Sequence, residues 1–430
     1  MRTIKSSMTR ISLLVGMVLL AVGCAAVASR TSSPRTVAQG HPVYDGTVLI
    51  DPSSQRVRAR WQIDFVRTPA MQDSATLLLN PGFRISVLTG RDISGFTELS
   101  DDDAKKITVH FAHPIPKKSA PSRIRISYEG VPVFGSDSIN RISPRWVELG
   151  LDSYWHPVFS DYGHLITGRM RIELPTGWRV AASGSLAQSG DAITLTNTVP
   201  LIDIAFSASP DLAFTERGNA RVYYAGAPPE IVPMILDITT ACTNWLDTHY
   251  GASDKLPPTR MVFAPRGGPG YARKNYIVIT SAADTLRLGN ERFVCHELAH
   301  YWSSGAIASG PENWLNEAFA EYVAGRYIRD AHGDSTYAAV VLKRWQGNSS
   351  NAGPIWTSTG TRRPTARAAY NKAPALLDQL ESRVGRGTMD KILAHYMTGG
   401  IHTTTALLDM IASVAGADAA AWFREQLASK

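Results

Sequence analysis

The sequence predicts an α+β protein in two parts, an N-terminal antiparallel β-sandwich domain followed by a mostly helical domain. Its 430 residues are 44% hydrophobic and 19% charged, which is the balance of a folded protein with about two domains. Alternating hydrophobic runs dominate from about residue 43 to 215, whereas helical spacing dominates beyond Arg217. We therefore place a β domain at 41–217 and a helical domain at 218–430.

The first residues have the pattern of an export signal. Basic residues precede a hydrophobic run from Ile11 to Val22, and small residues follow this run, which is the order of regions in a signal peptide. We assign residues 1–23 to a signal peptide. Residues 24–40 are small and polar and include a proline, so we assign them to a flexible tether.

Cys24 stands in the position of an acylated cysteine. With the segment Ala21–Gly23 before it, Cys24 resembles the lipid-modified cysteine of bacterial lipoproteins, and Ala25 is similar to the following residue in lipoproteins sorted to an outer membrane. This resemblance implies an exported, periplasmic protein held at the outer membrane by its lipid. Two alternatives are cleavage after Ala28 and an uncleaved anchor, because the hydrophobic stretch reaches the lower length limit of a membrane span.

The charge pattern excludes a nucleic-acid binder. The net charge is only +7 for 430 residues. No run of about five or six basic residues occurs, whereas a nucleic-acid surface shows clustered Lys and Arg.

Two cysteines remain besides Cys24, namely Cys242 and Cys295. An oxidising compartment would permit a disulfide between them. We nevertheless expect two buried thiols in helices, because free cysteine behaves as a small buried hydrophobe.

The order of elements follows from the spacing of hydrophobic residues. Strand-like runs bounded by Gly, Pro or Asp lie at 56–65, 84–88, 107–111, 123–128, 169–174 and 192–195. The second domain opens with a strand at 220–224 and a helix ending near Tyr250, followed by strands at 261–264 and 276–280. Helical spacing continues from there to the end of the chain.

The strongest local signal is an H-E-x-x-H pattern formed by His296, Glu297 and His300. On a helix, residues four apart share a face, so both imidazoles can bind one metal ion while the glutamate faces water at that ion. The pattern therefore predicts a zinc site with one Zn²⁺ per chain. The alternative is a pair of partly buried histidines without a metal.

A catalytic zinc site needs a third protein ligand and an open fourth position. The next helical segment carries Glu317 and, one turn later, Glu321. We expect Glu317 to return to the same ion. Glu321 is either a carboxylate that accepts a hydrogen bond from a ligating imidazole or an ordinary solvated helix residue.

These residues match a known family. The run His296-Glu-Leu-Ala-His300-Tyr-Trp302 together with the segment 314–320 resembles the aminopeptidase N family of gluzincin metallopeptidases, which includes leukotriene hydrolase. The connection between His300 and Glu317 is two residues shorter than is usual in that family. Downstream, the segment 369–377, which contains Tyr370, is similar to the Tyr-Glu-Lys-Gly-Ala segment of the family.

The resemblance implies a thermolysin-like catalytic domain and a zinc-dependent peptidase acting on peptide substrates. Glu297 would serve as the general base, and Tyr370 would donate its phenol to the oxyanion. We expect short peptides as substrates, because the site should lie in a cleft between the domains. The alternatives are a zinc peptidase with other end-specificity and a non-catalytic binding protein of the cell envelope.

The chain departs from the family where aminopeptidases bind the substrate amine. Family members have Gly-x-Met-Glu-Asn there, whereas this chain has Gly268, Gly270, Tyr271 and Arg273 in a segment without an acid. Glycines suit an edge that substrate backbone approaches closely, but Arg273 has the wrong charge for an amine. Glu148 in the β domain is the candidate replacement anchor, with an ordinary strand-edge carboxylate as the alternative.

Overall fold

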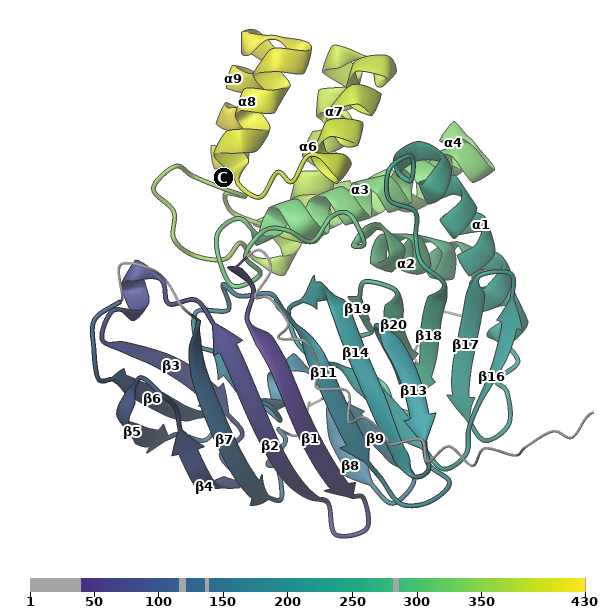
Figure 1. Ribbon diagram of the computed structural model, residues 1–430. Coiled ribbons are helices and arrows are strands. Elements are labelled where there is room, and N and C mark those ends of the chain that lie inside the picture. Colours follow the sequence, from purple (N-terminus) through teal and green to yellow (C-terminus); the bar gives the residue numbers. More distant parts are fainter. Residues whose placement is uncertain (1–39, 116–120, 136–138, 281–285, 430) are drawn as a thin grey trace, which may run out of the picture.

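The computed structural model describes residues 40–115, 121–135, 139–280 and 286–429. It confirms the predicted order of a β-rich domain followed by a largely helical one (Figure 1). The signal peptide at 1–23, Cys24 and all but the last residue of the tether at 24–40 lie outside the described residues. Within them, no helix has both the length and the apolar character needed to cross a membrane.

The first domain consists of short strands that alternate inward and outward residues. Its strands are β1 (Val43–Asp51), β2 (Arg56–Phe65), β3 (Ser74–Leu79), β4 (Phe83–Thr89), β5 (Ile93–Ser100), β6 (Lys105–Phe111), β7 (Ser122–Gly130), β8 (Arg141–Ser143), β9 (Trp146–Leu149), β10 (Val158–Phe159), β11 (Ile166–Glu173), β12 (Arg179–Ala182), β13 (Ser185–Ser189), β14 (Ala192–Leu201) and β15 (Phe206–Ser209). Short 3₁₀ turns lie at Pro69–Met71 and Leu151–Ser153. In β2, Trp61, Ile63 and Phe65 are buried while the residues between them are not, which is the period of a strand with one face in the core.

Three sheets form this domain within the described residues. Their strand orders are β13-β14-β11-β1-β2-β7-β4, β10-β3-β6-β5 and β12-β15-β9-β8. The pairings are antiparallel, as predicted, except that β1 runs parallel to β11, with Val43 opposite Thr167. The inward faces of the sheets share one hydrophobic core that includes Trp61, Trp155 and Phe206.

The second domain places a small sheet beneath a layer of helices (Figure 1). Its strands are β16 (Leu212–Arg217), β17 (Ala220–Ala225), β18 (Thr259–Ala264), β19 (Tyr271–Arg273) and β20 (Tyr276–Thr280), in the order β16-β17-β18-β20-β19. Its helices are α1 (Val232–Tyr250), α2 (Arg287–Ala299), α3 (Asn313–His332), α4 (Asp334–Thr336), α5 (Lys343–Asn348), α6 (Ala373–Val384), α7 (Arg386–Thr398), α8 (Thr404–Ala415) and α9 (Ala417–Ala428), with π-helical turns η4 (Tyr337–Leu342) and η5 (Ala368–Lys372).

The boundary between the domains lies earlier than the sequence predicts. Strand β16 pairs along its whole length with β17, from Leu212 opposite Ala225 to Arg217 opposite Ala220. It therefore belongs to the sheet of the second domain, and the boundary falls between Ser209 and Leu212 rather than at 217. A hairpin strand has the same local pattern in either domain, so only its pairing decides this assignment.

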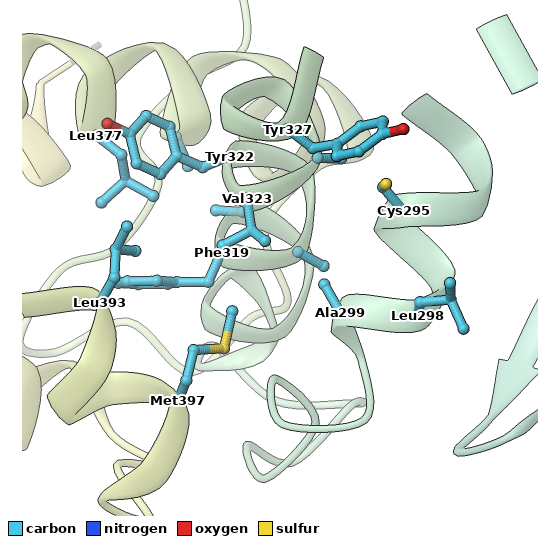
Figure 2. Close-up of a cluster of buried hydrophobic side chains, with 14 of the residues drawn as sticks. Cys295, Leu298, Ala299, Phe319, Tyr322, Val323, Tyr327, Leu377, Leu393 and Met397 are labelled. Atoms are coloured by element: carbon cyan, nitrogen blue, oxygen red, sulfur yellow. The ribbon is translucent and has the colours of Figure 1, made fainter. Parts of the chain in front are cut away.

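Helix α3 holds the second domain together. Figure 2 shows its Phe319 and Val323 between Ala299 of α2 on one side and Leu393 and Met397 of α7 on the other. These side chains are buried in one continuous hydrophobic cluster. The two helices that carry the predicted ligands are thus fixed against each other.

Cys242 and Cys295 form a disulfide, which corrects the expectation of two free thiols. It joins α1 to α2, with the two Cα atoms 5.7 Å apart, a separation that a disulfide can span. The sequence could not show this proximity, because 53 residues separate the two cysteines. The bond tethers α2 immediately before His296.

Candidate metal centre

The structure brings His296, His300 and Glu317 together. The two Nε2 atoms lie 3.1 Å apart, and Glu317 Oε2 lies 3.6 Å from that of His296 and 3.4 Å from that of His300. His296 is inside α2, whereas His300 caps its C-terminal end with helical backbone angles. Glu317 projects from the first turns of α3, so the shorter connection before it still reaches the histidines.

The outer nitrogen of each imidazole has a fixed acceptor. His296 Nδ1 lies 3.0 Å from Glu321 Oε2, and His300 Nδ1 lies 2.9 Å from the carbonyl oxygen of Ser303. Both partners accept, so each Nδ1 carries a proton, and Nε2 is the ring atom left to bind a metal ion. The hydroxyl of Ser303 in turn donates to the carbonyl of Asn316, next to Glu317, at 2.8 Å.

The three inner atoms fit a zinc ion. The two Nε2 atoms and a carboxylate oxygen converge on one point, as the three protein ligands of a catalytic zinc site do. Ligands about 2.0–2.1 Å from a tetrahedral zinc lie about 3.3 Å from one another, close to the 3.1, 3.4 and 3.6 Å between these atoms. These three residues could therefore hold Zn²⁺.

The two glutamates next to the histidines favour the binding of a cation. Burial raises the pKa of Glu321, but hydrogen bonding from His296 and the charge of Arg292 outweigh burial and lower it to about 2. Burial likewise opposes ionisation of Glu317, yet the two histidines lower its pKa well below the usual range. Both carboxylates are therefore anionic at neutral pH and attract a cation.

Glu297 follows His296 in α2 and lines the same cleft. Its side chain is buried, and burial raises its pKa while His296 and His300 oppose that shift. A carboxyl group whose pKa is raised is a stronger base than an ordinary glutamate, which suits both accepting and returning a proton.

Tyr370 lies across the site on the π-helical turn η5. Its ring stacks on that of His296, with centroids 5.8 Å apart and an angle of 22° between the planes. Burial and the charge of Glu317 raise the pKa of its phenol, so Tyr370 stays protonated and can donate. Single π-helical turns are rare in proteins, and those that occur are often found at functional sites.

The site opens into a cleft of about 870 Å³. The first domain contributes Tyr162 and Pro200 to its walls, and the second contributes Tyr271 and Trp302 along with the residues above. The centre thus lies between the domains, as the sequence analysis expects.

The glycine-rich segment is only partly at the cleft. Gly270, Tyr271 and Arg273 line it, whereas Gly268 is not among the lining residues and its carbonyl accepts a hydrogen bond from Thr280. Arg273 reaches the first domain and binds both oxygens of buried Asp203 at 2.5 and 2.9 Å. Its charge is therefore neutralised within the protein.

The structure does not support Glu148 as an amine anchor. Both oxygens of this fully buried residue accept from Arg266, at 2.7 and 3.0 Å, and Trp146 Nε1 also donates to it at 3.2 Å. Glu148 is absent from the cleft walls. The sequence offered no sign of this pairing, because the two residues are 118 positions apart.

Two cleft residues were missed by the sequence analysis. Arg292 precedes His296 by one helical turn and holds Glu321 at 2.6 and 2.7 Å, a position that the i, i+4 spacing could have indicated. Arg344 also reaches Glu321, at 3.2 Å. It comes from α5, and no local pattern in the sequence marks it.

The fold and the site together define a class, that of two-domain proteins with an HExxH metal centre completed by a glutamate from the next helix. Residues 270–423 match the family model of the Peptidase family M1 domain. The chain therefore carries an M1 peptidase domain, which confirms the resemblance to the aminopeptidase N and leukotriene hydrolase family. The match to this family implies zinc.

Similar sequences support this assignment. The chain is 28% identical to leucine aminopeptidase 2 of Sclerotinia sclerotiorum over 246 residues, covering 52% of this chain and 40% of that protein. It is 25% identical to a leukotriene A-4 hydrolase homolog of Botryotinia fuckeliana over 246 residues, covering 52% and 38%. The chain thus spans about two fifths of the length of these relatives.

Solved structures share the fold. The M1 zinc metallopeptidase of Deinococcus radiodurans superposes with a TM-score of 0.66 at 19% identity, covering 90% of this chain and 94% of that one. The yeast LTA4 hydrolase gives 0.67 at 17% identity, covering 90% and 65%. At these identities the likeness concerns the two-domain architecture.

Proposed function

We propose that this protein is a zinc-dependent metallopeptidase of the aminopeptidase N type that hydrolyses short peptides. The observation that carries the proposal is the convergence of the Nε2 atoms of His296 and His300 with Glu317, in a cleft between the domains that Glu297 and Tyr370 also line. The leucine aminopeptidases among its relatives support the same activity. One Zn²⁺ would be held by His296, His300 and Glu317.

The residues of the chain account for the chemistry. When bound, zinc would supply Lewis acidity that polarises the scissile carbonyl. Glu297 accepts the proton of the attacking water and passes it to the leaving amine. Tyr370 donates its phenolic hydrogen to the developing oxyanion, as a preorganised donor in a partly dehydrated cleft. Glu321 and the Ser303 carbonyl hold the imidazoles in the required tautomer.

A second candidate function is a zinc peptidase with other end-specificity. Among the described residues, the acids lining the cleft are Glu297, Glu317 and Glu321, and all three have roles in the proposed centre. An aminopeptidase with this cleft would therefore have to bind the free amine of its substrate without a further carboxylate from these walls. A purely binding role is less well supported, since it gives no use to Glu297 and Tyr370.

Hydrolysis of paired reporters tests the end-specificity. The purified protein should cleave leucyl- and alanyl-amide reporters with a free N-terminus, contain about one zinc per chain, and lose activity on chelation and regain it with zinc. Acetylation of the N-terminus should abolish cleavage. Cleavage restricted to N-blocked peptides would favour the second candidate, and absence of hydrolysis of either set by zinc-loaded protein would refute the peptidase proposal.

We also propose that the protein is exported and held at the outer membrane through lipid on Cys24. The sequence pattern around this residue supports the proposal. A Cys24→Ser variant should move from the membrane pellet to the soluble periplasmic fraction, whereas the wild-type chain should incorporate radiolabelled palmitate. Equal fractionation of the two proteins would contradict lipid anchoring.

A further inference from the structure

The walls of the cleft carry more positive than negative charge. Within the described residues, the basic side chains that line it are Arg273, Lys274, Arg292, Arg344 and Arg367, against the three glutamates already assigned to the centre. A zinc ion would add further positive charge. A cleft of this kind favours an anionic group on its ligand.

Two of these cations are already satisfied within the protein. Arg273 is neutralised by Asp203. Lys274 Nζ donates to the Tyr301 carbonyl and to Ser304 Oγ, at 2.6 and 3.0 Å, and burial lowers its pKa to about 8. The other basic side chains of the cleft are Arg292, Arg344 and the exposed Arg367, which donates to the Ser350 carbonyl. Of these three, Arg292 and Arg344 lie together, because both contact Glu321.

Arg292 and Arg344 share a single carboxylate. Both donate to Oε1 of Glu321, at 2.6 and 3.2 Å, and Glu321 also accepts from His296 and from Trp345 Nε1. No other ion pair of either arginine is found among the described residues. One carboxylate balances one guanidinium, so the pair keeps an excess charge of one.

This excess charge is accessible. Glu321 is 1% exposed, whereas the side chains of Arg292 and Arg344 are 23% and 40% exposed, and both line the cleft. The two guanidinium groups are therefore within reach of a ligand in the cleft. Paired guanidinium donors of this kind match the geometry of a carboxylate.

The distance to the metal centre limits where a carboxylate could sit on a substrate. Arg292 precedes His296 by one turn of α2, which is about 5.4 Å along the axis. An extended peptide advances about 3.3 Å per residue. On this scale, an anion held by Arg292 and Arg344 would lie about one to two residues from the carbonyl that reacts.

We propose that Arg292 and Arg344 form a carboxylate-binding subsite, so that the preferred substrates are peptides with a carboxylate within about two residues of the bond that is cleaved. The proposal rests on the proposed peptidase function and specifies its substrate class. The carboxylate would be either the C-terminal group of a dipeptide or an acidic side chain.

Binding without turnover tests the subsite. Zinc-loaded Glu297→Gln protein is titrated by calorimetry with Ala-Ala, with Ala-Ala-amide and with Ala-Asp-amide. Ala-Ala should bind about tenfold to a hundredfold more tightly than its amide, since the amide loses charge-assisted hydrogen bonds. Tight binding of Ala-Asp-amide would identify a side-chain carboxylate as an accepted source, and weak binding would restrict the subsite to the C-terminus.

Substitution of Arg344 assigns the preference to this pair. In the same background, Arg344→Gln should reduce the ratio of acid to amide affinity to about threefold or less, because it removes the excess guanidinium, at unchanged zinc content. Lys343→Gln is the matched control, since it removes the same charge from the neighbouring exposed residue, which does not line the cleft. The control should keep the full ratio.

The outcomes separate the two proposals. Equal affinity for acid and amide, or a preference that survives Arg344→Gln, would overturn the subsite even if the wild-type protein hydrolyses peptides. A carboxylate preference that is lost in Arg344→Gln but kept in Lys343→Gln would support the subsite. This result would stand even if the wild-type protein hydrolysed no peptide and the proposed peptidase function were wrong.

Discussion

Replacing Glu297 by glutamine should lower kcat for a peptide amide by about 10²–10⁴-fold, the range contributed by a positioned general base. Glutamine has the same shape but cannot accept the proton of the attacking water. The three proposed zinc ligands are untouched, so zinc content measured by mass spectrometry should match that of the wild-type protein. Steady-state kinetics on the same batches gives the comparison.

The thermal midpoint distinguishes this loss from misfolding. Burial raises the pKa of Glu297, which means that its charged form is disfavoured in the folded protein. A neutral glutamine should therefore leave the midpoint unchanged or raise it. Glu425→Gln, at an exposed site on α9, should keep full activity. A Glu297→Gln protein with more than a tenth of wild-type kcat would remove Glu297 from the role of base.

Replacing Glu148 by alanine should reduce the free energy of unfolding by about 3–5 kcal/mol, because it removes one partner of a buried, hydrogen-bonded ion pair. The side chains of Glu148 and Arg266 are 0% and 3% exposed. Their ion pair joins β9 of the first domain to the segment after β18. Arg266 retains hydrogen bonds to the carbonyls of Gly267 and Pro269. These neutral acceptors only partly offset the loss.

Urea denaturation of matched variants measures this effect. Glu129→Ala removes a carboxylate that pairs with Arg58 and Arg84 at the surface, where the arginine side chains are 60% and 74% exposed. Such pairs contribute about 0–1 kcal/mol, so this control should change stability little. A Glu148→Ala protein no less stable than the control would show that the buried pair contributes nothing to the contact between domains.

Local patterns in the sequence predicted most of the fold and the three candidate metal ligands. Alternation placed the runs at 56–65 and 123–128 in strands, since one face of each lies in a core. The four-residue spacing of His296 and His300 required a shared helix face, and the spacing from there to Glu317 and Glu321 required a second helix nearby. These features depend on neighbours along the chain, which a sequence displays directly.

Features that depend on distant pairing could not be predicted. The Cys242–Cys295 bond, the Glu148–Arg266 pair and the assignment of β16 to the second sheet all result from how separate segments meet. The sequence shows the chemical type of each residue but not its partner. The choice of Glu148 as an amine anchor failed for this reason.

The position of Ser303 has a consequence for how the metal centre is assembled. Its carbonyl orients His300, while its hydroxyl is bonded to the backbone beside Glu317, so one residue ties the end of α2 to the start of α3. Donors from both helices are thereby aligned when the domain folds, before any ion arrives. Binding of the metal ion should then require little further ordering of the protein. The affinity for the ion therefore depends on how the whole domain holds the two helices together.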